Sequence, residues 1–190
     1  MLVAPKLDYA LLAPLLIVLG GALLGVLIEA LIKKAARGAI QLTVALATLV
    51  LAFVNLFTVR HSDSTTAAVG SVTIDGVAIF LQGTILILAF FGLLYISDQD
   101  NFTASAAAVP GSEEERAAYA SGRQLTEVYP LTLFAVSGMM LFPMASDLIT
   151  LFVALEVLSL PLYLMTGLSR RRRLLSQEAA LKYFLDRKST

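Results

Sequence analysis

Residues 147–169 read DLITLFVALEVLSLPLYLMTGLS, and four arginines follow them directly. The run has the roughly 20 apolar residues that a helix needs to cross a hydrocarbon core about 30 Å thick. Between Asp147 and Ser169 its one charged side chain is Glu156. A carboxylate at a helix centre costs roughly 2.5–3.5 kcal/mol on membrane-insertion scales and is a functional-site hypothesis by default. The stretch therefore predicts a membrane-spanning helix with a functional acid near its middle.

The composition of the whole chain indicates an integral membrane protein. Its 190 residues are 58% hydrophobic and 15% charged, with a mean hydropathy of +0.82. Soluble domains typically hold about 25% charged and roughly 45–50% apolar residues. The formal net charge of zero excludes a generally basic nucleic-acid binder. Because the chain has no cysteine, we expect no disulfide, no cysteine nucleophile and no thiolate metal site, and its one histidine, His61, cannot form a histidine metal cluster. We expect neither a catalytic residue nor a metal site in this chain.

Five apolar stretches are each close to the length of a membrane span. A backbone in lipid must satisfy its own hydrogen bonds, and the chain shows no alternating ten-residue strand pattern, so these spans are predicted to be helices. We expect an all-α integral membrane protein, a single helical unit of about five spans with a partial sixth helix over residues 176–185. The five spans cover about residues 9–31, 39–59, 72–96, 128–144 and 148–168.

Basic residues predict the orientation of the spans. Lys33, Lys34 and Arg37 follow the first span, and the four arginines 170–173 follow the fifth. Alternating spans place both clusters on one side, which the positive-inside rule makes cytoplasmic. The N-terminus is then outside. The long loop at 97–127 is inside, and its acidic residues carry little weight in this rule.

The polar residues of the fifth span are expected to share one helix face. Ser159 and Tyr163 follow Glu156 at i+3 and i+7. Pro161 removes a backbone donor and is expected to bend the helix, freeing a carbonyl near Val157. These groups together favour a hydrated polar face that supports Glu156. The alternative is that Glu156 only bonds to a neighbouring helix and holds the bundle together.

Lys182 is a candidate partner for this acid. It lies in SQEAALKYFL at 176–185, where Ser176 is suited to cap a new helix. A Glu156 whose charge depends on a movable cation takes up and releases protons. Glu178 and Lys182 are also spaced i, i+4, so a simple surface ion pair is the alternative. The charged residues 186–188 interrupt this sixth apolar stretch.

Four motifs in the second half of the chain carry a family resemblance. Together they are similar to subunit N of the proton-translocating NADH–quinone oxidoreductase, respiratory complex I. The match is strong over about residues 125–185, and the earlier spans agree only in number and order. The motifs are Gly138-Met-Met, Ser146-Asp147-Leu148, Glu156-Val-Leu-Ser-Leu-Pro-Leu-Tyr163 and Ser176-Gln-Glu-Ala-Ala-Leu-Lys-Tyr-Phe184.

This resemblance implies a role in proton translocation. The family resembles sodium/proton antiporters and transporters built from inverted repeats around broken helices. By match to its motif, Glu156 is the glutamate of the fifth helix and Lys182 the lysine at the start of the sixth. Such subunits bind no cofactor of their own, while the complex uses NADH and quinone. The expected partners are the other membrane subunits and the lipid of a bacterial plasma membrane.

The chain also departs from the family pattern. Complete members have many more spans, including a lysine in the seventh helix, whereas this chain ends near the fifth or sixth. We therefore expect an N-terminal part of the subunit, truncated, frameshifted or partial, that does not pump protons alone. Two other functions stay open, a subunit of a sodium/proton antiporter complex and a non-catalytic membrane assembly protein.

Overall fold

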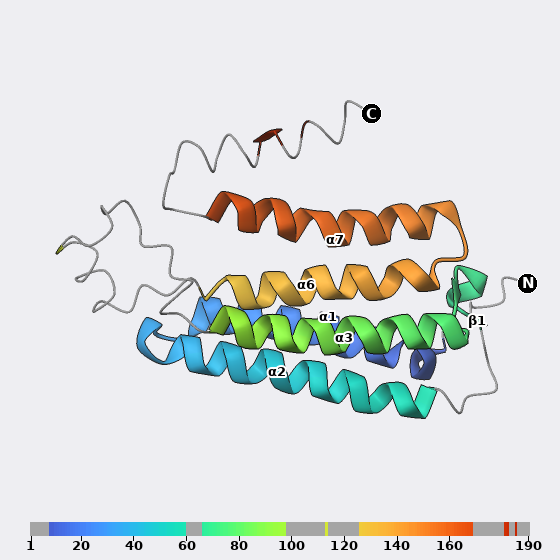
Figure 1. Cartoon of the computed structure of the whole chain (residues 1–190), viewed down its shortest axis with the longest axis horizontal. Helices are drawn as coiled ribbons and strands as arrows, with labels where there is room; N and C mark the ends of the chain where they lie inside the picture. Colours follow the sequence, from blue (N-terminus) through green and yellow to red (C-terminus); the bar gives the residue numbers. More distant parts are fainter. Residues whose placement is uncertain are drawn as a thin grey trace, which may run out of the picture.

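The computed structural model describes residues 8–59, 66–97, 113, 126–168, 181–182 and 185, which form a bundle of long helices (Figure 1). Among these residues, four helices are long and apolar enough to cross a membrane, and residues 128–144 form a shorter apolar helix. The predicted all-α membrane class is confirmed. The elements are α1 (Tyr9–Leu31), α2 (Lys34–Val59), β1 (Thr66–Ala67), η1 (Ala68–Gly70), β2 (Val72–Thr73), α3 (Gly76–Ser97), α6 (Val128–Leu141), η2 (Phe142–Met144) and α7 (Leu148–Leu168).

One expected helix start was wrong. The third span begins at Gly76 and not at residue 72, because Val72 and Thr73 pair with β1 in an antiparallel hairpin. Asp75 then begins α3, its Oδ1 accepting a hydrogen bond from the Ala78 amide at 2.7 Å. The second predicted span, residues 39–59, lies within α2, which begins five residues earlier, at Lys34.

Other expectations fall outside the described residues. They include most of the loop at 97–127 and most of the partial sixth helix at 176–185. Within that last segment, Leu181, Lys182 and Leu185 are described as helical.

Helix α6 lies between α7 and the other helices of the bundle, and α7 lies on its outer side (Figure 1). The core that surrounds α6 is built from small and branched side chains of α1, α2 and α3. Almost every turn of α6 is buried, whereas α7 packs chiefly against α6. The fully buried members of this core include Val18, Ala22, Leu49, Leu86, Leu93, Leu133 and Met140.

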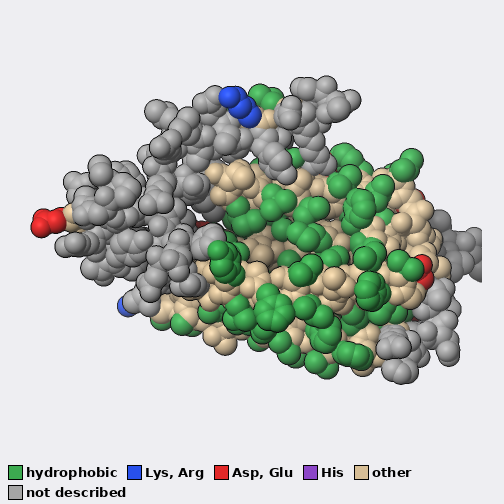
Figure 2. Space-filling model, in the orientation of Figure 1, with side chains coloured by type: hydrophobic (Ala, Val, Ile, Leu, Met, Phe, Trp, Pro, Cys, Tyr) green, Lys and Arg blue, Asp and Glu red, His purple; other side chains and the backbone are tan. Residues whose placement is uncertain are grey.

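The outer surface of the bundle is apolar along its length. Figure 2 shows apolar side chains spread over the long middle of the face that it presents. Large hydrophobic side chains are strongly exposed on α3 and α7, among them Phe80 at 71% and Leu148 at 82%. Soluble monomers rarely expose so large a contiguous apolar surface. A surrounding hydrocarbon phase accounts for it.

The β-hairpin before α3 docks on the turn between α6 and α7, at the right-hand end of Figure 1. The Ser146 amide donates to the Ser71 carbonyl at 3.0 Å, and the Thr73 and Ser146 hydroxyls are 2.6 Å apart. At the tip, Ala68 and Val69 have positive φ angles of 49° and 61°. This arrangement fixes the end of the bundle at which α7 begins.

Candidate functional site

Asp147 caps the first turn of α7, as the sequence predicted. The Thr150 amide donates to its Oδ1 at 2.7 Å, and the Thr150 hydroxyl donates to its Oδ2 at 3.1 Å. The backbone hydrogen bond from Thr150 is the main cause that lowers the pKa of Asp147, with smaller contributions from the Thr150 and Ser71 hydroxyls. The cap holds the end of the helix that carries Glu156.

Glu156 lies nine residues further on, about 12–14 Å along the axis at 1.5 Å per residue. It is therefore close to the middle of α7, and its side chain is half-buried. The central position that the sequence predicted for this acid is the one it occupies in the helix.

The face of α7 that packs on α6 does not contain Glu156. Glu156 is two residues from Ala154 and two from Leu158, and two residues turn the chain by about 200° around a helix. Its side chain is therefore directed away from α6. Four residues form the stripe of α7 that faces α6: Ala154, Leu158, Pro161 and Met165. Ala154 and Pro161 are buried, and the Leu158 backbone contacts Gly138. The Thr132 hydroxyl lies 3.8 Å from the Met165 sulfur.

The supporting residues occupy mixed surroundings. Ser159 is buried, and its hydroxyl lies 3.4 Å from the backbone carbonyl of Glu156. Tyr163 is half-buried, and its carbonyl accepts a hydrogen bond from Thr166. Helix α7 continues through Pro161 to Leu168, so the proline does not end it. Proline has no amide hydrogen, so Val157, four residues earlier, has lost its helical donor.

Lys182 is a helical residue with an exposed side chain. Residues 169–180, which connect it to α7, lie outside the described part of the chain. An interaction between Lys182 and Glu156 therefore stays a prediction.

A second carboxylate, which the sequence reasoning missed, lies near the end of α1. Glu29 accepts hydrogen bonds from Arg37 and Gln41 of α2, and from the Thr126 hydroxyl just before α6. Its ion pair with Arg37 is well shielded, with side chains 18% and 16% exposed. The signal for this cluster was present in the sequence, since Glu29 is the acid within the first apolar span and Arg37 follows eight residues later.

The Glu29 cluster has the properties of a fixed clamp. Arg37 also donates two hydrogen bonds to the Ile32 carbonyl, at 3.1 and 2.6 Å, and so satisfies the end of α1. A guanidinium does not lose its proton in proteins. Glu29 therefore keeps a permanent counter-charge, and the cluster joins α1, α2 and the start of α6. Arg37, one of the basic residues from which the orientation was predicted, is thus hydrogen-bonded to α1 and ion-paired with Glu29.

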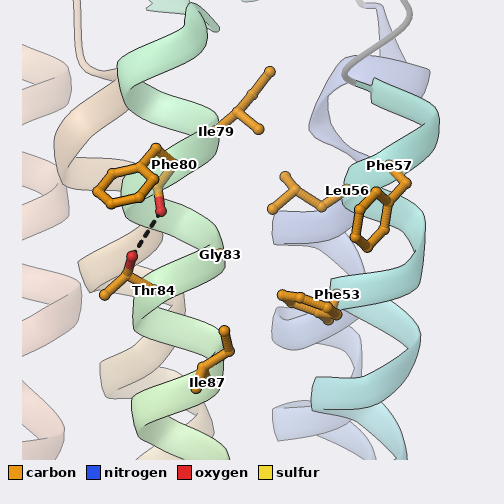
Figure 3. Close-up of a pocket in the computed structure, with 8 residues that line it drawn as sticks. All are labelled: Phe53, Leu56, Phe57, Ile79, Phe80, Gly83, Thr84 and Ile87. Carbon is orange, nitrogen blue, oxygen red and sulfur yellow. Dashed lines mark hydrogen bonds between the residues drawn. The ribbon is translucent and has the colours of Figure 1, made fainter.

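An open groove lies between α2 and α3 and is about 220 Å³ in volume (Figure 3). Its walls carry apolar side chains, including Phe53 and Ile87, and its polar group, the Thr84 hydroxyl, donates to the Phe80 carbonyl at 2.9 Å. Nothing in these walls is suited to hold an ion. In the part of the chain that the structure describes, no group of three or more His, Cys, Asp or Glu side chains is placed to hold a metal.

The membrane-spanning helices define a polytopic helical membrane protein. One helix carries an acid at its centre, and another carries a hydrogen-bonded ion pair near its end. No family model matches the chain. It is 52% identical over 187 residues to a protein of Acidothermus cellulolyticus, and 52% identical over 191 residues to one of Thermobifida fusca. It is 43% identical over 205 residues to a protein of Mycobacterium tuberculosis. Each alignment covers 96% of this chain.

All three relatives are named NADH-quinone oxidoreductase subunit N. The chain is therefore homologous to a part of that subunit, and the resemblance seen in its second half is confirmed and extends over nearly its whole length. It spans 35–39% of the length of these relatives.

Proposed function

We propose that this chain is a membrane portion of an NADH–quinone oxidoreductase, where it couples electron transfer from NADH to quinone with proton translocation. The name of its relatives supports the assignment to the complex. NADH and quinone react on other subunits, and this chain contributes no cofactor and no redox chemistry of its own. Its partners are the other membrane subunits and the lipid of a bacterial plasma membrane, with its N-terminus outside.

The observation that carries the proton-translocating role is the place of Glu156. The acid lies at the centre of an apolar helix, and α6, the helix packed against α7, has no charged residue from Val128 to Leu141. The charge on Glu156 therefore depends strongly on what approaches its own face of α7. A cation moving toward that face favours release of the proton to water, and its withdrawal favours uptake. Lys182 is the proposed cation.

Glu29 gives the contrast that makes Glu156 the better candidate. Glu29 accepts hydrogen bonds from three side chains and is ion-paired with Arg37, so it links α1, α2 and the start of α6 and is assigned a structural role. The proposed roles are therefore translocation at Glu156 and Lys182, with support from Ser159, Pro161 and Tyr163.

The test replaces Glu156 with Gln and with Asp in the intact enzyme. NADH-driven proton uptake and NADH–quinone electron transfer are measured together in membrane vesicles. We expect Glu156→Gln to lower the number of protons moved per electron while the enzyme still assembles, and Glu156→Asp to retain part of it. Unchanged pumping in Glu156→Gln means that the acid only holds helices together. Pumping that a sodium ionophore abolishes indicates the antiporter alternative.

A further inference from the structure

Gly138 brings the backbone of α6 into direct contact with the backbone of α7. A Cβ atom added to Gly138 would meet the amide nitrogen of Leu158, and would lie 2.7 Å from its Cα and 2.9 Å from the carbonyl carbon of Val157. Real Cβ atoms essentially never come within 3.0 Å of another heavy atom in this way. Any residue other than glycine must therefore push the two helices apart.

The displacement would fall on α7, because α6 is held on its other sides. Leu133, Val136 and Met140 of α6 belong to the buried core formed with α1, α2 and α3. The Gln82 amide of α3 also reaches the Met140 carbonyl at 3.5 Å. Packed interiors yield little. By comparison, α7 lies on the outside of the bundle (Figure 1).

The peptide that contacts Gly138 begins one residue after Glu156. It joins Val157 to Leu158, and the Val157 carbonyl has no helical donor because residue 161 is a proline. This part of α7 therefore depends on packing more than an ordinary helical turn does. The contact with Gly138 supplies that packing, one residue away from the acid.

We infer that Gly138 is a positioning residue for Glu156, an inference that rests on the function proposed above. Gly138 sets the separation of α6 and α7 and so the distance from α6 at which Glu156 presents its carboxyl group to an approaching cation. A displacement of about 1 Å can cost a reaction as much as 100-fold. We expect Gly138→Ala to lose about half or more of the proton translocation per electron that Glu156→Gln loses.

Two other glycines provide matched controls. Gly21 of α1 is as tightly packed, but against the Thr48 side chain of α2, and Gly92 of α3 has nothing within 4 Å of an added Cβ. Proton uptake and electron transfer are measured in vesicles that carry the intact enzyme. Gly21→Ala should lower the amount of assembled enzyme and leave protons per electron unchanged. Gly92→Ala should change neither quantity.

A second measurement follows the helix separation without any activity. The chain has no cysteine, so Thr132→Cys and Met165→Cys place one thiol on each helix where the native side chains are in contact. A short bifunctional thiol reagent should join this pair more slowly when Gly138→Ala is added than when Gly92→Ala is added. Equal rates overturn the inference, and this result is readable even where assembly of the enzyme fails.

The activity outcomes separate the two levels of the argument. If Glu156→Gln pumps normally, the proposed function is wrong and the inference fails with it. If Glu156→Gln loses pumping but Gly138→Ala gives the same protons per electron as Gly21→Ala, the proposed function stands and the positioning role of Gly138 is refuted.

Discussion

The hydroxyl of Thr126 lies 3.0 and 2.9 Å from the two carboxylate oxygens of Glu29, although the residues are 97 positions apart in the sequence. This bond ties the start of α6 to the end of α1. Together with the Arg37 ion pair it closes the end of the bundle that is opposite to the start of α7 (Figure 1). The α6 helix, on which α7 rests, is therefore anchored at this end.

Removal of the Thr126 hydroxyl should destabilise this anchor. Thr126→Val keeps the shape of the side chain but takes a donor from a shielded carboxylate, and a hydrogen bond to a charged group contributes about 1.5–3 kcal/mol. We expect a loss of that size in the free energy of unfolding, measured by thermal denaturation in detergent. Thr43→Val is the control, because the exposed Thr43 hydroxyl bonds only to its own helix. An equal loss of stability in the two variants would contradict a stabilising role of the Thr126–Glu29 hydrogen bond.

The cap at the start of α7 should make stability depend on acid pH. The pKa of Asp147 is lowered from 3.8 in the folded protein, so its contribution to stability is fully present above that value and is lost as the pH falls through the lower, folded pKa. We expect the melting temperature of the wild type to exceed that of Asp147→Asn at neutral pH. The difference should narrow below pH 3.8. A difference that stays constant with pH would show that the charge plays no part.

The tip of the β-hairpin offers a stabilising substitution. Val69 is exposed and has a φ of 61°, a left-handed conformation that costs an L residue roughly 1–2 kcal/mol. Asparagine tolerates this conformation better. We expect Val69→Asn to raise the free energy of unfolding by about 0.5–1 kcal/mol. The β-branched control Val69→Thr should bring no gain, and a gain in both would rule out backbone strain as the cause.

The proline of α7 can be tested against the proline of α1. Pro161→Ala restores an amide that can bond to the Val157 carbonyl, a gain of about 0.5–1.5 kcal/mol in helix stability. If the opened carbonyl assists Glu156, protons moved per electron should fall although the helix is more stable. The control variant is Pro14→Ala, which makes the same change inside α1. Normal coupling in Pro161→Ala would remove the carbonyl from the proposed site.

The helices could be predicted from the sequence because a lipid environment restricts which sequences can cross it. A membrane span must be apolar for about 20 residues and satisfy its own backbone, so composition alone locates it. Asp147 was predictable as a cap because capping is a local interaction within one turn. The start of α3 was not, because Val72 and Thr73 extend the apolar run and only the hairpin partner separates them from the helix.

The Glu29 cluster and the Gly138 contact depend on tertiary structure. The partners of Glu29 come from three different segments, and no local pattern brings Thr126 to Glu29. Gly138 reads as an ordinary glycine until the Leu158 backbone is placed against it. The face of α7 that carries Glu156 also became clear only when the α6-facing stripe was known.

The most direct test of the central claim is to observe the charge of Glu156 during turnover. Difference infrared spectra of the intact enzyme are recorded with and without NADH, for the wild type and for Glu156→Gln. We predict a signal of a carboxyl group gaining or losing its proton that is present in the wild type and absent from the variant. Identical difference spectra in the carboxyl region would contradict the account, because a Glu156 that keeps one charge state throughout turnover cannot carry protons.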